Sequence, residues 1–191
     1  MASSSTSICN SALIKIGADL ITALSDNNKR AIYCNEQYAK LRDEVMISHP
    51  WNFAVARKAL AKTVNTPIFD YAYEYTLPSD VLRVLDVEGD YEWEVAINAA
   101  GNAKVLLADS GTINCKYIKQ VTDTTLFTPI FDECLATRLA ADIAYGLVQN
   151  LSLQERMIAV YQQLLGQARS FDAQEMSIRE VDADDWLNQR F

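Results

Sequence analysis

One histidine, four cysteines and 25 acidic residues are the side chains in this 191-residue sequence that could carry catalytic or metal chemistry. A Ser-His-Asp hydrolase would need His49 as its base, but the sequence has no Gly-x-Ser-x-Gly turn to present a serine. His49 stands directly before Pro50, at the point where a helical pattern stops. We therefore interpret His49 as a structural residue at a helix end and keep a catalytic base as the alternative.

The four cysteines are too widely spaced for a metal site. Cys9, Cys34, Cys115 and Cys134 form no Cys-x-x-Cys pair and have no histidine near them in the sequence. Zinc sites need clustered ligands, so we expect no metal and no cofactor. The spacing favours buried free thiols in a reducing compartment.

The acidic residues suggest a second kind of enzyme. A glycosidase holds two carboxyl groups about 5–9.5 Å apart across a cleft. The sequence singles out no such pair among its acids, so a glycoside hydrolase remains the alternative to a protein without enzymatic activity.

The charge balance also limits the partners. The formal net charge is −8, with 25 acids against 17 bases, which argues against a protein that grips the DNA backbone. An acidic wall that repels phosphate is compatible with a channel through which DNA passes without being bound. No apolar run is long enough to cross a bilayer, so we expect no membrane partner.

Hydrophobic spacing predicts helices at both ends of the chain. Apolar residues recur at intervals of three and four over 6–17 and 28–47, and again from Thr128 and from Ser152, which we expect to cap helices. Between these helices the period changes to two, which indicates four or five short strands in an antiparallel meander, with a hairpin at Gly101.

Large aromatic residues follow the second predicted helix. We expect residues 51–55 to be extended, with Trp51 and Phe53 as core residues that seat the helix end against the bundle; a surface for a neighbouring subunit is the alternative. Tyr71, Tyr73 and Tyr75 would share one face of a strand, and acids rather than bases surround them. This favours a sheet core or a subunit interface over a base-stacking surface.

These patterns predict an α+β, mainly helical fold. An antiparallel helical bundle is built from both chain ends, with an inserted antiparallel β sub-domain and an extended C-terminal tail. The predicted parts are a discontinuous bundle of residues 1–66 and 123–171, a β sub-domain of residues 67–122, and a tail of residues 172–191.

Several stretches together resemble the head-to-tail adaptor proteins of short-tailed bacteriophages, also called the tail tubular protein A family. The resemblance extends over nearly the whole chain and depends on the order and spacing of its pieces. The matching stretches are NSALIKIGADLITALSD at 10–26, the helix with Cys34 and Tyr38, HPWNFA at 49–54, YEYTLPSDVLRVL at 73–85, CKYIKQVTDTTLFTPIF at 115–131, RLAADIA at 138–144 and DDWLNQR at 184–190.

The resemblance implies a structural virion protein. Such a subunit would join the portal to the tail at the head-tail junction and extend the DNA channel. It would form a ring, typically of 12 copies, between the portal protein and a downstream tail or nozzle protein, after synthesis in the host bacterial cytoplasm. DNA would pass through the lumen without specific binding. Because some phage tail proteins cut peptidoglycan, the alternative enzyme is a tail-associated peptidoglycan hydrolase. A phage or prophage chaperone of similar fold is a further alternative.

The tail supplies the only site residues that the resemblance lets us assign. Trp186, Leu187 and Arg190 match the family's tail motif, and we add Phe191 because it continues the apolar tip. Our hypothesis is that Trp186 and Leu187 fill an apolar pocket on another subunit, while Arg190 pairs with an acid at its rim.

Overall fold

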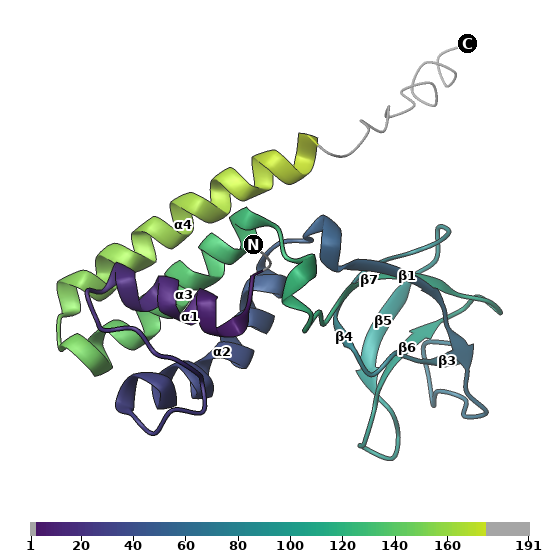
Figure 1. The fold of residues 1–191 in the computed structure, drawn as a ribbon. Helices are drawn as coiled ribbons and strands as arrows, with labels where there is room; N and C mark the ends of the chain where they lie inside the picture. The colour runs from purple at the N-terminus through teal and green to yellow at the C-terminus, as the bar shows by residue number, and fades with distance from the viewer. Residues whose placement is uncertain (1–2, 175–191) are drawn as a thin grey trace, which may run out of the picture.

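The structure is a computed structural model that describes residues 3–174. Helices from both ends of the chain pack together in a bundle. The antiparallel β unit comes between them in the sequence and lies to one side of the bundle (Figure 1). The helices are α1 (Ser5–Lys15), α2 (Lys29–Ser48), α3 (Pro129–Val148) and α4 (Leu151–Gln174), with 3-10 turns η1 (Asn52–Ala54) and η2 (Thr124–Leu126). The strands are β1 (Val55–Ala59), β2 (Ala61–Lys62), β3 (Tyr73–Thr76), β4 (Val81–Val87), β5 (Trp93–Ile97), β6 (Lys104–Ala108) and β7 (Asn114–Lys119). The predicted α+β fold class is confirmed. Residues 172–174 of the predicted C-terminal tail are the last residues of α4, and residues 175–191 lie outside the described residues.

All four helices begin at a side chain that accepts a hydrogen bond from a backbone N–H of the first turn, and for α4 this side chain is that of Asn150. Ser4 accepts a hydrogen bond from the Ser7 N–H at 3.1 Å, and the Ser7 hydroxyl accepts one from the Ser4 N–H at 2.8 Å. Asn28 caps α2 by accepting from the Ala31 N–H at 2.9 Å. Thr128 caps α3, with proline in the first turn. Such caps replace intrahelical bonds that the first turn cannot make, each worth about 1 kcal/mol.

Helix α3 is the central helix of the bundle, because it packs against α1, α2 and α4. Its small residues let neighbouring helices come close. Its buried residues are Phe131, Cys134, Leu135, Ala136, Thr137, Leu139, Ala140, Ala141, Ile143 and Ala144. Arg138 binds Glu44 of α2 at 2.9 Å, and Lys15 of α1 binds Glu133. Exposed ion pairs contribute at most about 1 kcal/mol each, so burial of apolar side chains dominates the stability of the bundle.

An aromatic cluster closes the bundle where α2 ends. Trp51 is fully buried, and its indole Nε1–H donates to the Val45 carbonyl at 2.9 Å. The rings of Trp51 and Phe131 pack edge-on, with their centroids 5.1 Å apart. The ring centroid of Phe53 lies 5.0 Å from that of Phe131 and 5.5 Å from that of Phe127. The predicted core role is confirmed for Trp51, whereas Phe53 is half-buried and packs against this core. The predicted extended segment is wrong for residues 52–54, which form the 3-10 turn η1.

The β unit contains two antiparallel sheets. One has the strand order β1-β7-β4 and the other β2-β3-β6-β5. Antiparallel pairing and the hairpin at Gly101, which has a φ of 72°, are confirmed. The predicted meander of four or five strands is wrong, because seven strands form and the chain repeatedly changes sheet. Strands β1 and β2 also lie before residue 67, the predicted start of the β sub-domain, because β1 pairs with the distant β7.

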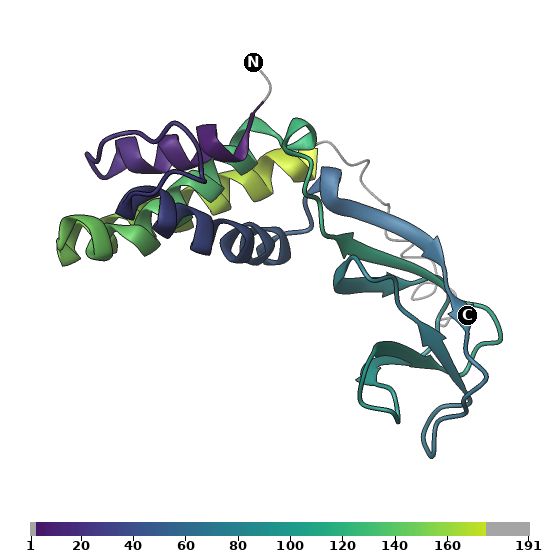
Figure 2. The same cartoon turned by 60° about the horizontal axis from the view of Figure 1, so that its bottom comes forward.

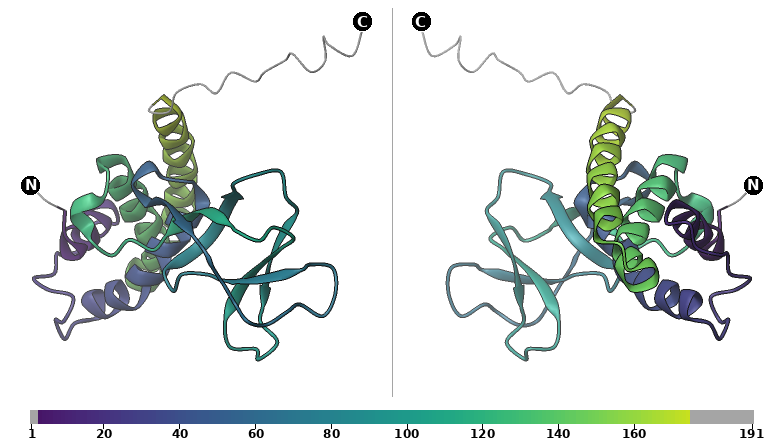
Figure 3. Two further views of the ribbon diagram at one scale, coloured as in Figure 1. Left: turned by 90° about the vertical axis from the view of Figure 1, so that its right-hand side faces the viewer. Right: turned by 90° about the vertical axis from the view of Figure 1, so that its left-hand side faces the viewer.

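The β unit has its own core, which meets the bundle core along β7. Tyr75, Leu106, Cys115 and Tyr117 are buried between the two sheets. Ile118 points to the opposite face of β7 and belongs to the helical core. Figures 2 and 3 show the two parts side by side, joined by the chain crossings that lead into β1 and out of β7.

Within residues 3–174, no helix combines the length and apolarity needed to cross a membrane.

Candidate functional site

The four residues predicted to bind a partner, Trp186, Leu187, Arg190 and Phe191, lie outside the described residues. Their role stays a prediction.

His49 lies at the C-terminal end of α2, where its ring meets that of Trp51 edge-on at 5.2 Å. This position on the aromatic cluster agrees with a structural role.

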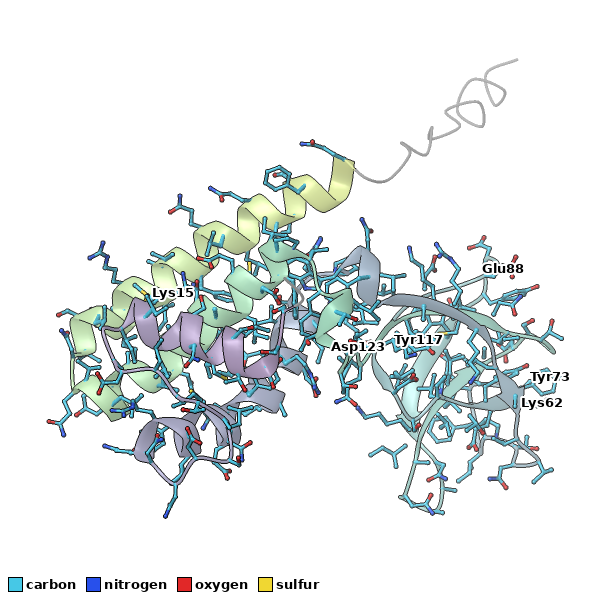
Figure 4. The ribbon with its side chains drawn as sticks, in the orientation of Figure 1. Lys15, Lys62, Tyr73, Glu88, Tyr117 and Asp123 are labelled. Atoms are coloured by element: carbon cyan, nitrogen blue, oxygen red, sulfur yellow. The ribbon has the colours of Figure 1, made fainter. Side chains whose placement is uncertain are left out.

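The three tyrosines predicted to share one face of a strand do not all lie in it. Strand β3 begins at Tyr73, so Tyr71 lies in the preceding loop, and Tyr75 is fully buried. Figure 4 shows Tyr73 at the far end of the β unit beside Lys62, whose ammonium lies 3.4 Å from the ring centroid.

All four cysteines are free and buried, as the spacing predicts. A hydrogen bond with Cys34 and burial both raise the pKa of the Cys9 thiol. Burial raises the pKa of Cys115 and of Cys134, each to about 11. Thiols held in the protonated form, such as Cys9, Cys115 and Cys134, are poor nucleophiles and poor metal ligands, whereas the hydrogen bond with Cys9 lowers the pKa of Cys34. Among residues 3–174, no three His, Cys, Asp or Glu side chains gather in a way that could hold a metal ion.

The buried thiols lead to a pH-dependent stability. Cys115 and Cys134 titrate at about 11 in the folded protein, against an ordinary value of 9.0, so the folded state holds their protons more tightly. Their contribution is fully present below pH 9 and is lost as the pH rises through 11. We expect the free energy of unfolding, measured by denaturant titration, to fall between pH 9 and 11. The fall should be shallower in the variant Cys115→Ala/Cys134→Ala; equal slopes would contradict this assignment.

A pocket of about 450 Å³ opens between the loop that precedes β3 and the outer face of the second sheet. We call it the loop pocket. Its lining consists of Asn65, Thr66, Pro67, Ile68, Phe69, Asp70, Tyr71, Glu74, Glu94, Ala96, Ile97, Ala99 and Leu107. Ile68 and Phe69 are 91% and 73% exposed, and Ile97 of the edge strand β5 is 68% exposed. A concave surface with exposed apolar walls is typical of a binding site.

Carboxylates supply all the formal charge of the loop pocket. Asp70, Glu74 and Glu94 line it, and its lining has no lysine or arginine. Glu74 is only 5% exposed, and its side chain accepts a hydrogen bond from the Thr63 hydroxyl at 3.0 Å. A buried carboxylate normally has a cation or several donors as partners, because removing the charge from water is costly. The pocket therefore has the chemistry to bind a cation with apolar neighbours.

Strand register fixes the relation between two of these carboxylates. Glu74 and Glu94 are both register partners of Leu107, on the strands that flank β6. Partners across a strand pair share a face, and strands lie about 4.8 Å apart, so the two Cα atoms are about 10 Å apart. Desolvation raises the pKa of Tyr71, and the negative charge of Glu94 adds to the effect. The loop itself is strained at Asp70, whose φ is 67°.

The loop pocket was missed at the sequence level. The apolar run Ile68-Phe69 next to Pro67 was the available signal, since large apolar residues are unusual in an exposed loop. Its contact with Glu94 and Leu107 depends on the β3-β6-β5 pairing, which local periodicity does not encode. No family model matches the chain, and no curated protein matches it.

Proposed function

We propose that this chain is a structural subunit of a head-to-tail adaptor ring, which joins a portal protein to a downstream tail or nozzle protein and extends the DNA channel. The proposal starts from the resemblance of the sequence to the tail tubular protein A family. It is supported by the division of the chain into a helical bundle from both ends and a projecting β unit, which suits a part with two different neighbours.

The observation that carries the proposal is the apolar surface at the end of the β unit. Val64, Ile68 and Phe69 are 101%, 91% and 73% exposed, although the same unit has a separate, well-buried core. A protein that acts alone gains nothing by leaving such side chains in water, whereas a subunit covers them on assembly.

The net charge of −8 supports the proposed relation to DNA. A surface that repels phosphate lets a duplex move through a ring without being held. We assign the assembled ring to the head-tail junction of the virion, with synthesis in the cytoplasm of the host bacterium.

The test is the mass of the protein mixed with its candidate portal protein, measured by light scattering after size-exclusion chromatography. We expect one large closed complex, with about 12 copies of this chain per portal ring. Val64→Ser/Ile68→Ser should weaken that complex, because these exposed side chains contribute to assembly but not to the fold. Two separate peaks with the unmodified chain would overturn the proposal.

The loop pocket also supports a second candidate function, a tail-associated peptidoglycan hydrolase. Glu74 and Glu94 face the same cavity, and carboxyl groups on side chains whose Cα atoms are about 10 Å apart can approach the separation of a glycosidase pair. A zymogram separates the two functions. Clearing that Glu74→Gln abolishes would establish the hydrolase, and absence of clearing with the unmodified chain would remove it.

A further inference from the structure

The chemistry of the loop pocket restricts what can occupy it. The lining is apolar and aromatic with three carboxylates, and it contains no cation. Glu74 is nearly buried, and its carboxylate accepts a hydrogen bond from the neutral hydroxyl of Thr63. A suitable occupant therefore brings large apolar side chains and one positive charge close together. A polyanion such as a DNA duplex is the wrong chemistry, because carboxylates repel phosphate.

The part of this chain beyond residue 174 contains such a segment. Residues 186–191 read Trp-Leu-Asn-Gln-Arg-Phe, which combines three large apolar side chains with a single arginine. Aromatic residues and arginine are the types most enriched where interfaces gain their binding energy. A guanidinium can also pair with a carboxylate through two parallel hydrogen bonds. The carboxylates of the pocket repel Asp184 and Asp185, which directly precede this segment, so only residues 186–191 match the chemistry of the pocket.

The length of chain after α4 allows the segment to reach another subunit. Twelve positions separate Trp186 from Gln174, which corresponds to as much as about 40 Å in an extended chain. A contact of tail to pocket is heterologous, so each copy would offer one tail and one pocket, and repetition of the contact can close a ring.

We infer that residues 186–191 of one copy dock in the loop pocket of a neighbouring copy. Trp186 and Leu187 pack on Phe69, Ile68 and Ile97, and Arg190 pairs with the carboxylates of Glu74 and Glu94. This inference rests on the proposed function, since it names the contact that links copies within the ring. Each docked tail raises the effective concentration of the next, so weak individual contacts suffice.

The direct test uses a fluorescent peptide of residues 180–191 and the full-length chain with its own tail disabled by Trp186→Ser/Arg190→Glu. Fluorescence anisotropy should show saturable binding. We expect at least tenfold weaker binding to the same chain carrying Glu74→Gln/Glu94→Gln, and a similar loss with Phe69→Ala, which removes an exposed ring without touching either core. The matched control is Glu88→Gln, because Glu88 pairs with Asn114 at the edge of the other sheet (Figure 4).

Three results would overturn the inference. They are the absence of saturable binding, equal losses with the pocket variant and the Glu88→Gln control, and a full-length chain that excludes the peptide while staying monomeric at every concentration in sedimentation velocity. The last result would place the tail in the pocket of its own chain.

The peptide experiment needs no portal protein, so its failure can be told apart from failure of the proposed function. If the chain forms a closed complex with the portal but its loop pocket does not bind the peptide, only the tail contact is refuted. If the peptide binds and no portal complex forms, the adaptor function is refuted and the self-association remains.

Discussion

Replacing Trp51 with alanine is expected to lower the free energy of unfolding by about 3–5 kcal/mol, the usual cost of removing a large buried aromatic side chain. Trp51 is fully buried, contacts the rings of His49, Phe53 and Phe131, and donates its indole N–H to the Val45 carbonyl in the last turns of α2. The substitution would leave a cavity at the point where the bundle meets the chain crossing into β1. Urea titration followed by far-UV circular dichroism measures the loss.

Two further variants make this result interpretable. Trp51→Phe keeps an aromatic ring but removes the N–H, so it should cost less than the alanine variant. Phe171→Ala is the control for loss of an aromatic side chain, because Phe171 is 59% exposed and its removal should change stability by less than about 0.5 kcal/mol. A loss below 1 kcal/mol for Trp51→Ala would contradict the core role of this residue.

Removing residues 175–191 is expected to leave the fold intact and to abolish assembly with the portal. The cut falls after Gln174, the last residue of α4, and the two cores are built from residues upstream of it. The thermal midpoint should therefore stay within a few degrees of that of the complete chain. The amount of closed complex should fall at least tenfold in size-exclusion chromatography with light scattering, because each subunit loses its docking segment.

A full-length variant separates loss of the segment from loss of chain length. Trp186→Ser/Leu187→Ser/Arg190→Glu keeps every residue position but removes the apolar side chains and reverses the charge. It should assemble as poorly as the truncated chain. Normal assembly by either protein would refute the role that we assign to the tail.

The helices were predictable because their signals are local. The apolar stripe of α2 and its cap at Asn28, and the start of α3 at Thr128, lie where the sequence places them. One local signal was misleading. The run from Ser152 to Glu155 has the form of a capping box, but α4 starts at Leu151, and Asn150 is the cap, because its side chain accepts from the Leu153 N–H at 3.0 Å.

The strand arrangement and the candidate site were less predictable because they depend on distant partners. Val55 pairs with Ile118, more than 60 positions away. The adjacent polar residues Arg57 and Lys58 interrupt the alternation of apolar and polar residues that would have indicated a strand there. The same is true of Glu74 and Glu94, which line one pocket because β3 and β5 both pair with β6. Periodicity reports which face of an element is buried, and it does not report which elements are neighbours.

Strand β7 has a mechanical consequence. Its side chains alternate between two cores, with Tyr117 in that of the β unit and Ile118 in that of the helices. A force applied to the β unit therefore reaches the bundle through the packed side chains of β7 as well as through the covalent backbone. If the chain joins a portal to a tail as we propose, load between those two bodies would pass through this strand.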